Sequence, residues 1–199
     1  MSSGMRSMKF LAIALAAAVL AACTPPEPPR FNAANMTGIE YGKDFRMRDA
    51  DGRERTITEF HGKVVMIFFG FIQCPDICPT ALLRAVEIRN LLGEDARHMQ
   101  LLFVTVDPER DSPEVIKAYM EAFDPSFIGL RESPERTREI ADSFHVLYNK
   151  VPTGDSYTMD HTATTFIFDP TGRLRLAAPH IMPANLIADD IRTLLRTTR

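Results

Sequence analysis

Two cysteines separated by three residues have the clearest chemical potential in this sequence. Cys74 and Cys78 stand in the segment Cys74-Pro-Asp-Ile-Cys78-Pro-Thr, which directly follows the apolar run Val64 to Phe71. Two thiols at this spacing can form a disulfide or hold a metal ion. The chain of 199 residues contains only three cysteines, so the pair is not part of a larger disulfide framework.

The three-residue spacing favours a metal without excluding oxidation. On an α-helix, positions four apart are separated by roughly 6 Å along the axis, near the upper part of the Cα range that a disulfide tolerates. A metal about 2.3 Å from each sulfur needs the sulfurs nearly 4 Å apart, whereas a disulfide brings them to about 2 Å. Pro75 and Pro79 both suit a first helical turn, and either could open the following helix. In both cases the positive helix end should lower the pKa of the thiols.

The third cysteine indicates export. Residues 1–22 carry Arg6 and Lys9, continue with an uncharged stretch, and end in Leu20-Ala21-Ala22 before Cys23. This pattern is typical of a signal peptide and is too short for a comfortable membrane span of about 20 apolar residues. The tetrad ending at Cys23 also resembles a bacterial lipobox, which implies cleavage before Cys23 and its diacylation. The sequence thus predicts a lipidated Cys23 followed by a proline-rich tether over residues 23–42.

One domain remains, over residues 43–199, with folding expected to start near Asp44. Its size of roughly 155 residues suits a single domain with a sizeable core. The formal charge of the chain is −3 and no basic cluster is present, which argues against nucleic acid as a partner. No dinucleotide-binding or P-loop motif occurs either, so a nucleotide cofactor is not expected.

Strand and helix patterns alternate along this domain. The run 63–71 is apolar without alternation, as expected of a strand that is buried on both faces. The other expected elements are a hairpin (45–47 and 53–56), strands at 99–106 and 127–130, a second hairpin (164–168 and 174–177), and helices at 79–92, 113–123, 134–144 and 184–195. A central mixed sheet flanked by helices, with a dithiol after a central strand and an added N-terminal hairpin, predicts an α/β thioredoxin-like fold.

Three separated motifs, in this order, resemble the Sco (SenC) family. They are the segment Phe68 to Thr80 with both cysteines, Val104-Thr-Val-Asp107-Pro-Glu-Arg-Asp111, and Asp160-His161-Thr162. The resemblance covers about residues 40–195. It implies a membrane-tethered, thioredoxin-like protein that binds copper and assists assembly of the copper A centre of cytochrome c oxidase.

The resemblance also singles out His161 as the third metal ligand. By position alone, His161 comes just before the apolar run 164–168 and so near the end of an expected strand. Two thiolates and one imidazole are soft enough for Cu(I), and such sets also serve Cu(II). Three ligands underfill a structural zinc site, which is usually closed at four. Copper bound by Cys74, Cys78 and His161 is therefore the predicted site.

Two acidic residues are candidates for a supporting role. Asp160 could orient the neighbouring imidazole, although an exposed loop acid explains it equally well. Asp107 follows the strand 99–106 and either faces the same pocket or caps the next turn.

Two functions fit these features. The first is a copper chaperone that passes the ion to subunit II of cytochrome c oxidase or to another copper or thiol protein, which is metal delivery more than enzyme catalysis. The second is a thiol:disulfide oxidoreductase in which Cys74 and Cys78 reduce a partner's cysteines. Either would work on the periplasmic side of a bacterial cell envelope, lipid-anchored through Cys23. A partner in the inner membrane favours that membrane, whereas Thr24 stands where retained lipoproteins commonly carry aspartate.

Overall fold

The computed structural model describes residues 28–198. The expected signal peptide (1–22) and Cys23 lie outside the described residues. Within 28–198, no helix has the length and apolar character needed to cross a membrane.

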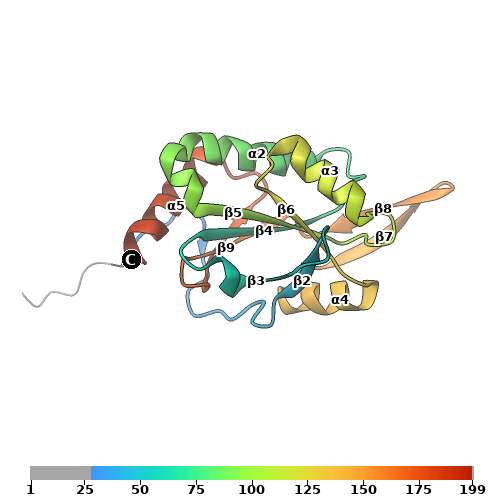
Figure 1. Ribbon diagram of the computed structural model, residues 1–199, viewed down its shortest axis with the longest axis horizontal. Coiled ribbons are helices and arrows are strands. Elements are labelled where there is room, and N and C mark those ends of the chain that lie inside the picture. The colour runs from blue at the N-terminus through green and yellow to red at the C-terminus, as the bar shows by residue number, and fades with distance from the viewer. Residues whose placement is uncertain (1–27, 199) are drawn as a thin grey trace, which may run out of the picture. The chain divides into compact units, whose positions relative to one another are not determined.

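A central mixed sheet of eight strands organises the domain (Figure 1). Three neighbouring strands near its middle run parallel, in the order β4 (Val64–Gly70), β5 (Met99–Thr105) and β6 (Ile128–Arg131). Antiparallel strands complete both sides. They are β9 (Thr164–Phe168), β10 (Leu174–Pro179) and β1 (Ala34–Asn35) beside β4, and β2 (Arg46–Asp49) and β3 (Glu54–Thr56) beside β6.

The two central strands bring the site-bearing loops to one end of the sheet. Every residue of β4 and β5 is buried, which explains why both read as continuous apolar runs. Their register pairs Val64 with Met99 and Gly70 with Thr105, so the strands end level with each other. The cysteine loop after β4 and the Asp107–Asp111 loop after β5 therefore leave the sheet side by side.

In the described part of the chain, four α-helices cover the sheet. Helices α2 (Ile77–Leu92), α3 (Pro113–Phe123) and α5 (Ala184–Thr197) lie on one face, and α4 (Pro134–Ser143) lies on the other (Figure 1). The start of α3 is fixed as the sequence predicts: Ser112 caps it by accepting a hydrogen bond from the backbone of Val115. Ser133 caps α4 in the same way. Short 3-10 helices, η1 (Ile57–Phe60) and η2 (Gly93–His98), fill two connections.

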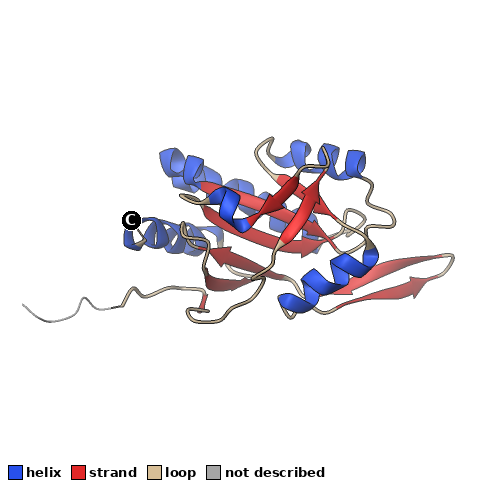
Figure 2. Cartoon of the chain, turned by 60° about the horizontal axis from the view of Figure 1, so that its bottom comes forward, coloured by secondary structure: helices blue, strands red, loops and turns tan. Residues whose placement is uncertain are grey.

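A second sheet, which the sequence analysis did not predict, carries the histidine. Strands β7 (Tyr148–Thr153) and β8 (Ser156–His161) pair antiparallel with each other and belong to no other sheet. This hairpin projects from the body of the domain in both views (Figures 1 and 2). Its last residue, His161, pairs with Tyr148 at the end nearest the domain.

The packed part of the chain begins upstream of the expected start near Asp44. Strand β1 pairs with β10. The backbone amides of Asn32 and Ala33 donate hydrogen bonds of 2.8 Å to the buried carboxylate of Asp190 in α5. Part of the segment expected to act as a tether thus belongs to the folded domain. The predicted thioredoxin-like architecture is otherwise confirmed, including the N-terminal hairpin β2–β3.

Candidate metal site

The cysteine loop starts where β4 ends. Gly70 is required there, because a Cβ atom at this position would come within 2.9 Å of the Cys78 sulfur and 2.8 Å of the Phe103 ring. The loop turns back at once: the Cys74 amide donates to the Phe71 carbonyl at 3.3 Å. Helix α2 then begins at Ile77, so neither proline that could have opened it is its first residue.

This helix start places the two thiols in different environments. Cys74 lies in the loop and is half-buried, whereas Cys78 lies in the first turn of α2 and is fully buried. The backbone amide of Cys78 donates to the sulfur of Cys74 at 3.4 Å. Both cysteines are free thiols in the structure.

Burial reverses the expected effect on the Cys78 thiol. The sequence analysis predicted that the helix end would lower the pKa of both thiols. The structure instead gives Cys78 a strongly raised pKa, because the sulfur is removed from water, and a backbone hydrogen bond from Phe71 only partly offsets this. Desolvation of the thiolate therefore outweighs the helix end at this position.

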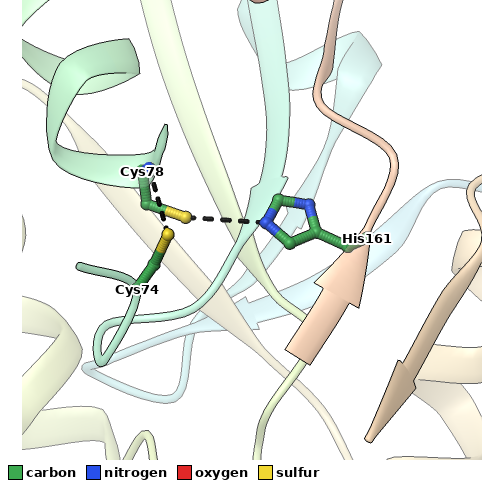
Figure 3. Close-up of side chains that lie close together, drawn as sticks. All are labelled: Cys74, Cys78 and His161. Atoms are coloured by element: carbon green, nitrogen blue, oxygen red, sulfur yellow. Dashed lines mark hydrogen bonds between the residues drawn. The ribbon is translucent and has the colours of Figure 1, made fainter. Parts of the chain in front are cut away.

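His161 approaches the cysteines from the hairpin. Its Nε2 atom lies 3.7 Å from the sulfur of Cys78, which points toward the imidazole, while the sulfur of Cys74 points toward the backbone nitrogen of Cys78 (Figure 3). Its Nδ1 atom lies 3.1 Å from the carbonyl oxygen of Thr162. A carbonyl oxygen can only accept, so in the neutral ring Nδ1 carries the proton and Nε2 presents its lone pair to the sulfurs. Burial also lowers the pKa of His161, which keeps the imidazole neutral.

The structure thus brings together the three residues predicted from the sequence. One donor atom from each of Cys74, Cys78 and His161 lies within 4.8 Å of the other two. A metal about 2.3 Å from sulfur and about 2.0 Å from nitrogen needs its donor atoms roughly 3.5 to 4 Å apart. The observed 3.7 Å from sulfur to nitrogen meets this requirement. The three side chains can hold one metal ion with only small adjustments.

The two acidic candidates lie outside this donor group. Asp107 is buried, and its carboxylate accepts hydrogen bonds from Arg110 and from the Tyr157 hydroxyl. Asp160 is exposed, and in the described part of the chain no hydrogen bond joins it to His161. Its charge nevertheless partly opposes the lowering of the His161 pKa.

The buried residues that support the site were not predicted from the sequence. Asp111 is as buried as Asp107 and contacts the cysteine loop, and Tyr157 connects the hairpin to Asp107. The cluster of acidic residues in Asp107-Pro-Glu-Arg-Asp111 was visible. Its meaning was not, because the contacts that tie these carboxylates to the cysteine loop and to the hairpin lie 39 and 50 residues away in the sequence.

Comparison with known proteins identifies the family. The SCO1/SenC family model matches residues 33–196. A SCO2-like protein of Rickettsia felis is 35% identical over 153 residues, which cover 74% of this chain and 75% of that protein. The structure of Bradyrhizobium japonicum ScoI with copper bound matches with a TM-score of 0.69 and 34% identity, covering 81% of this chain and 98% of that one. Apo Sco1 from Thermus thermophilus matches with a TM-score of 0.69 and 36% identity, covering 85% and 98%. The chain therefore belongs to the SCO1/SenC family.

Proposed function

We propose that this protein is a copper chaperone that binds one copper ion through Cys74, Cys78 and His161 and passes it to a partner. The observation that carries the proposal is the meeting of two thiols and the Nε2 atom of a neutral imidazole within 4.8 Å. The donors come from two segments that are more than 80 residues apart and that meet only in the fold.

The donor set favours copper among the common metals. Thiolate and imidazole suit Cu(I), and sets of cysteine and histidine also bind Cu(II). A structural zinc site would usually need a fourth protein ligand. The copper-bound relative from B. japonicum supports the same choice.

A site with three ligands on a protein surface is suited to transfer. Cys78 is deeply buried, whereas Cys74 is partly exposed. An incoming thiolate of a partner can take an open coordination position, and Cys74 can then leave first. Stepwise exchange of ligands moves the ion without releasing it into water.

The recipient that we propose is the copper A centre in subunit II of cytochrome c oxidase, as the family resemblance implies. The protein would meet it on the periplasmic side of a bacterial envelope membrane, attached through a diacylated Cys23. The proline-rich residues after Cys23 and the lipobox-like tetrad that ends at Cys23 support this placement.

Replacement of His161 by alanine tests the proposal. We expect the His161→Ala variant to lose about 10-fold or more in copper affinity, measured by competition titration of the reduced protein, because one of three ligands is gone. His61→Ala is the matched control, since His61 is exposed just before the opposite end of β4. Unchanged copper affinity in His161→Ala would contradict the ligand assignment.

The second candidate function is thiol:disulfide exchange, which the short contact between the Cys78 amide and the Cys74 sulfur favours. The thiolate of Cys74 would attack a partner disulfide, and Cys78 would then displace the partner and leave a Cys74–Cys78 disulfide, with two electrons passing to the partner. This reaction does not require His161. A reductase would therefore keep its rate of disulfide reduction in His161→Ala, whereas a chaperone would lose tight copper binding.

A further inference from the structure

The segment Asp107–Asp111 contacts both halves of the candidate site: the loop that carries Cys74 (the cysteine half) and the β7–β8 hairpin that carries His161 (the histidine half). It leaves β5 beside the cysteine loop and closes a turn in which the Asp111 amide donates to the Asp107 carbonyl at 3.0 Å. Asp107 and Asp111 are each only 1% exposed. Two buried acids four residues apart need partners, because an unpaired buried charge is strongly unfavourable.

Asp111 holds the cysteine half. One of its carboxylate oxygens accepts from the Ile72 amide at 3.2 Å and from the Thr105 hydroxyl at 2.5 Å. Ile72 stands two residues before Cys74, and Thr105 is the last residue of β5. Asp111 thus fixes the start of the cysteine loop to the end of the neighbouring strand.

Asp107 and Arg110 hold the histidine half. The Tyr157 hydroxyl donates to Asp107 at 2.9 Å, and the Arg110 guanidinium donates both to Asp107 and, at 2.7 Å, to the Tyr157 carbonyl. The same guanidinium lies 3.7 Å from the centre of the Tyr157 ring. Tyr157 is in β8, four residues before His161. These contacts fix the strand that carries the imidazole.

The hairpin needs such a connection. A two-stranded hairpin is marginally stable in water by itself, and β7–β8 pairs with no other strand among residues 28–198. Asp107 and Arg110 therefore add side-chain contacts to a hairpin whose Tyr148 and Met159 side chains already pack in the domain core. The position of His161 depends on this connection as well as on its own strand.

We propose that Asp107–Asp111 is a positioning bridge: Asp111 holds the cysteine loop and Asp107 holds the histidine hairpin, so that the segment sets the 3.7 Å separation between Cys78 sulfur and His161 Nε2. The inference rests on the proposed function, because its consequence is the geometry of copper binding. The residues of the bridge do not bind the ion themselves. They keep the two halves of the site at the separation that copper requires.

Two substitutions test the connection to each half of the site separately. Tyr157→Phe keeps the ring but removes the hydroxyl that donates to Asp107, and Asp111→Ala removes the acceptor for Ile72 and Thr105. We expect each to lower copper affinity by about 10-fold, the size of effect seen when groups that orient metal ligands are removed. Each should also alter the Cu(II) electron paramagnetic resonance spectrum, and Tyr157→Phe should speed amide hydrogen exchange in β7–β8 of the metal-free protein. Asp111→Asn, which keeps an acceptor, should restore most of the affinity.

Tyr148→Phe is the matched control. Tyr148 lies in the same hairpin, and no hydrogen bond of its hydroxyl occurs within the described residues, so this variant should bind copper as the unmodified protein does. Wild-type affinity and spectrum in Tyr157→Phe would overturn the inference, and this conservative variant decides the question if Asp111→Ala does not fold. Failure of the proposed function would look different: His161→Ala would then bind copper as tightly as the unmodified protein.

Discussion

At the residue scale, burial sets the protonation of the metal-free site. It raises the pKa of the Cys78 thiol and lowers the pKa of the His161 imidazole, so each group is held in its neutral form. The imidazole is then ready to coordinate, because its Nδ1 proton is directed at the Thr162 carbonyl. The thiol is not, because coordination requires the thiolate. Metal binding must therefore release a proton from Cys78.

The raised pKa of Cys78 predicts a loss of stability in alkali. Above the ordinary thiol pKa of 9.0, the unfolded chain releases this proton while the folded protein retains it. The unfolded state is therefore stabilised relative to the folded state as the pH rises. The free energy of unfolding of the reduced, metal-free protein should fall with rising pH, by up to about 1.4 kcal/mol per pH unit from this group. Urea unfolding at a series of pH values measures the slope. Cys78→Ser removes the titrating group, and an equal slope in that variant would contradict the assignment.

At the element scale, the sequence was informative wherever an apolar pattern had a consistent period or a clear start signal. The buried runs of β4 and β5 and the Ser-Pro-Glu starts of α3 and α4 were predicted within a few residues. The hairpin β7–β8 was missed because β7 is exposed at every position after Tyr148, so it lacks the alternation of a half-buried strand.

In the candidate site, too, some features could be predicted from local sequence and others could not. Both cysteines and His161 could be predicted, because their types and the motifs around them are local. The start of α2 at Ile77 and the roles of Asp111 and Tyr157 could not, because they depend on partners that are distant in the sequence. The raised thiol pKa was missed for the same reason, since burial is a property of the fold.

The junction of β4 and α2 makes Gly70 a sensitive position. Gly70→Ala should destabilise the protein by about 1–3 kcal/mol, because its methyl group would press on the Cys78 sulfur and the Phe103 ring. It should also weaken copper binding by displacing the thiol. Gly129→Ala is the matched control: its Cβ would meet Ile116 at 1.9 Å, so it should destabilise the fold without changing the copper spectrum. Urea unfolding and copper titration of both variants test this, and a normal copper spectrum in Gly70→Ala would contradict it.

At the scale of the whole molecule, segments from three regions of the chain build one site. The cysteine loop follows β4, the Asp107–Asp111 segment follows β5, and His161 ends β8. The parallel register of β4 and β5 brings the first two together, and the part-buried hydrogen bonds of Asp107 and Arg110 with Tyr157 join the third to them. The central sheet thus positions the cysteine loop and the Asp107–Asp111 segment, and side-chain contacts help to position the end of β8.

The proposed lipid attachment can be tested on the full chain in a bacterial host. Cys23→Ser should move the protein from the membrane fraction to the soluble periplasmic fraction, because the residue that receives the diacylglycerol is lost. Immunoblotting of the two fractions measures the change. Thr24→Ser is the matched control and should stay in the membrane fraction; if Cys23→Ser also stays there, the attachment does not depend on Cys23.

The contact of Asn32 and Ala33 with Asp190 limits how far the copper site could travel from the membrane. Only residues 24–30 separate the proposed lipid on Cys23 from Phe31, where the folded unit begins. Seven residues span at most about 25 Å when fully extended. If Cys23 carries the proposed lipid, Phe31 would stay within about this distance of the bilayer surface. A membrane-embedded acceptor would then meet the domain at a high effective concentration, so even a weak pairwise affinity could sustain transfer.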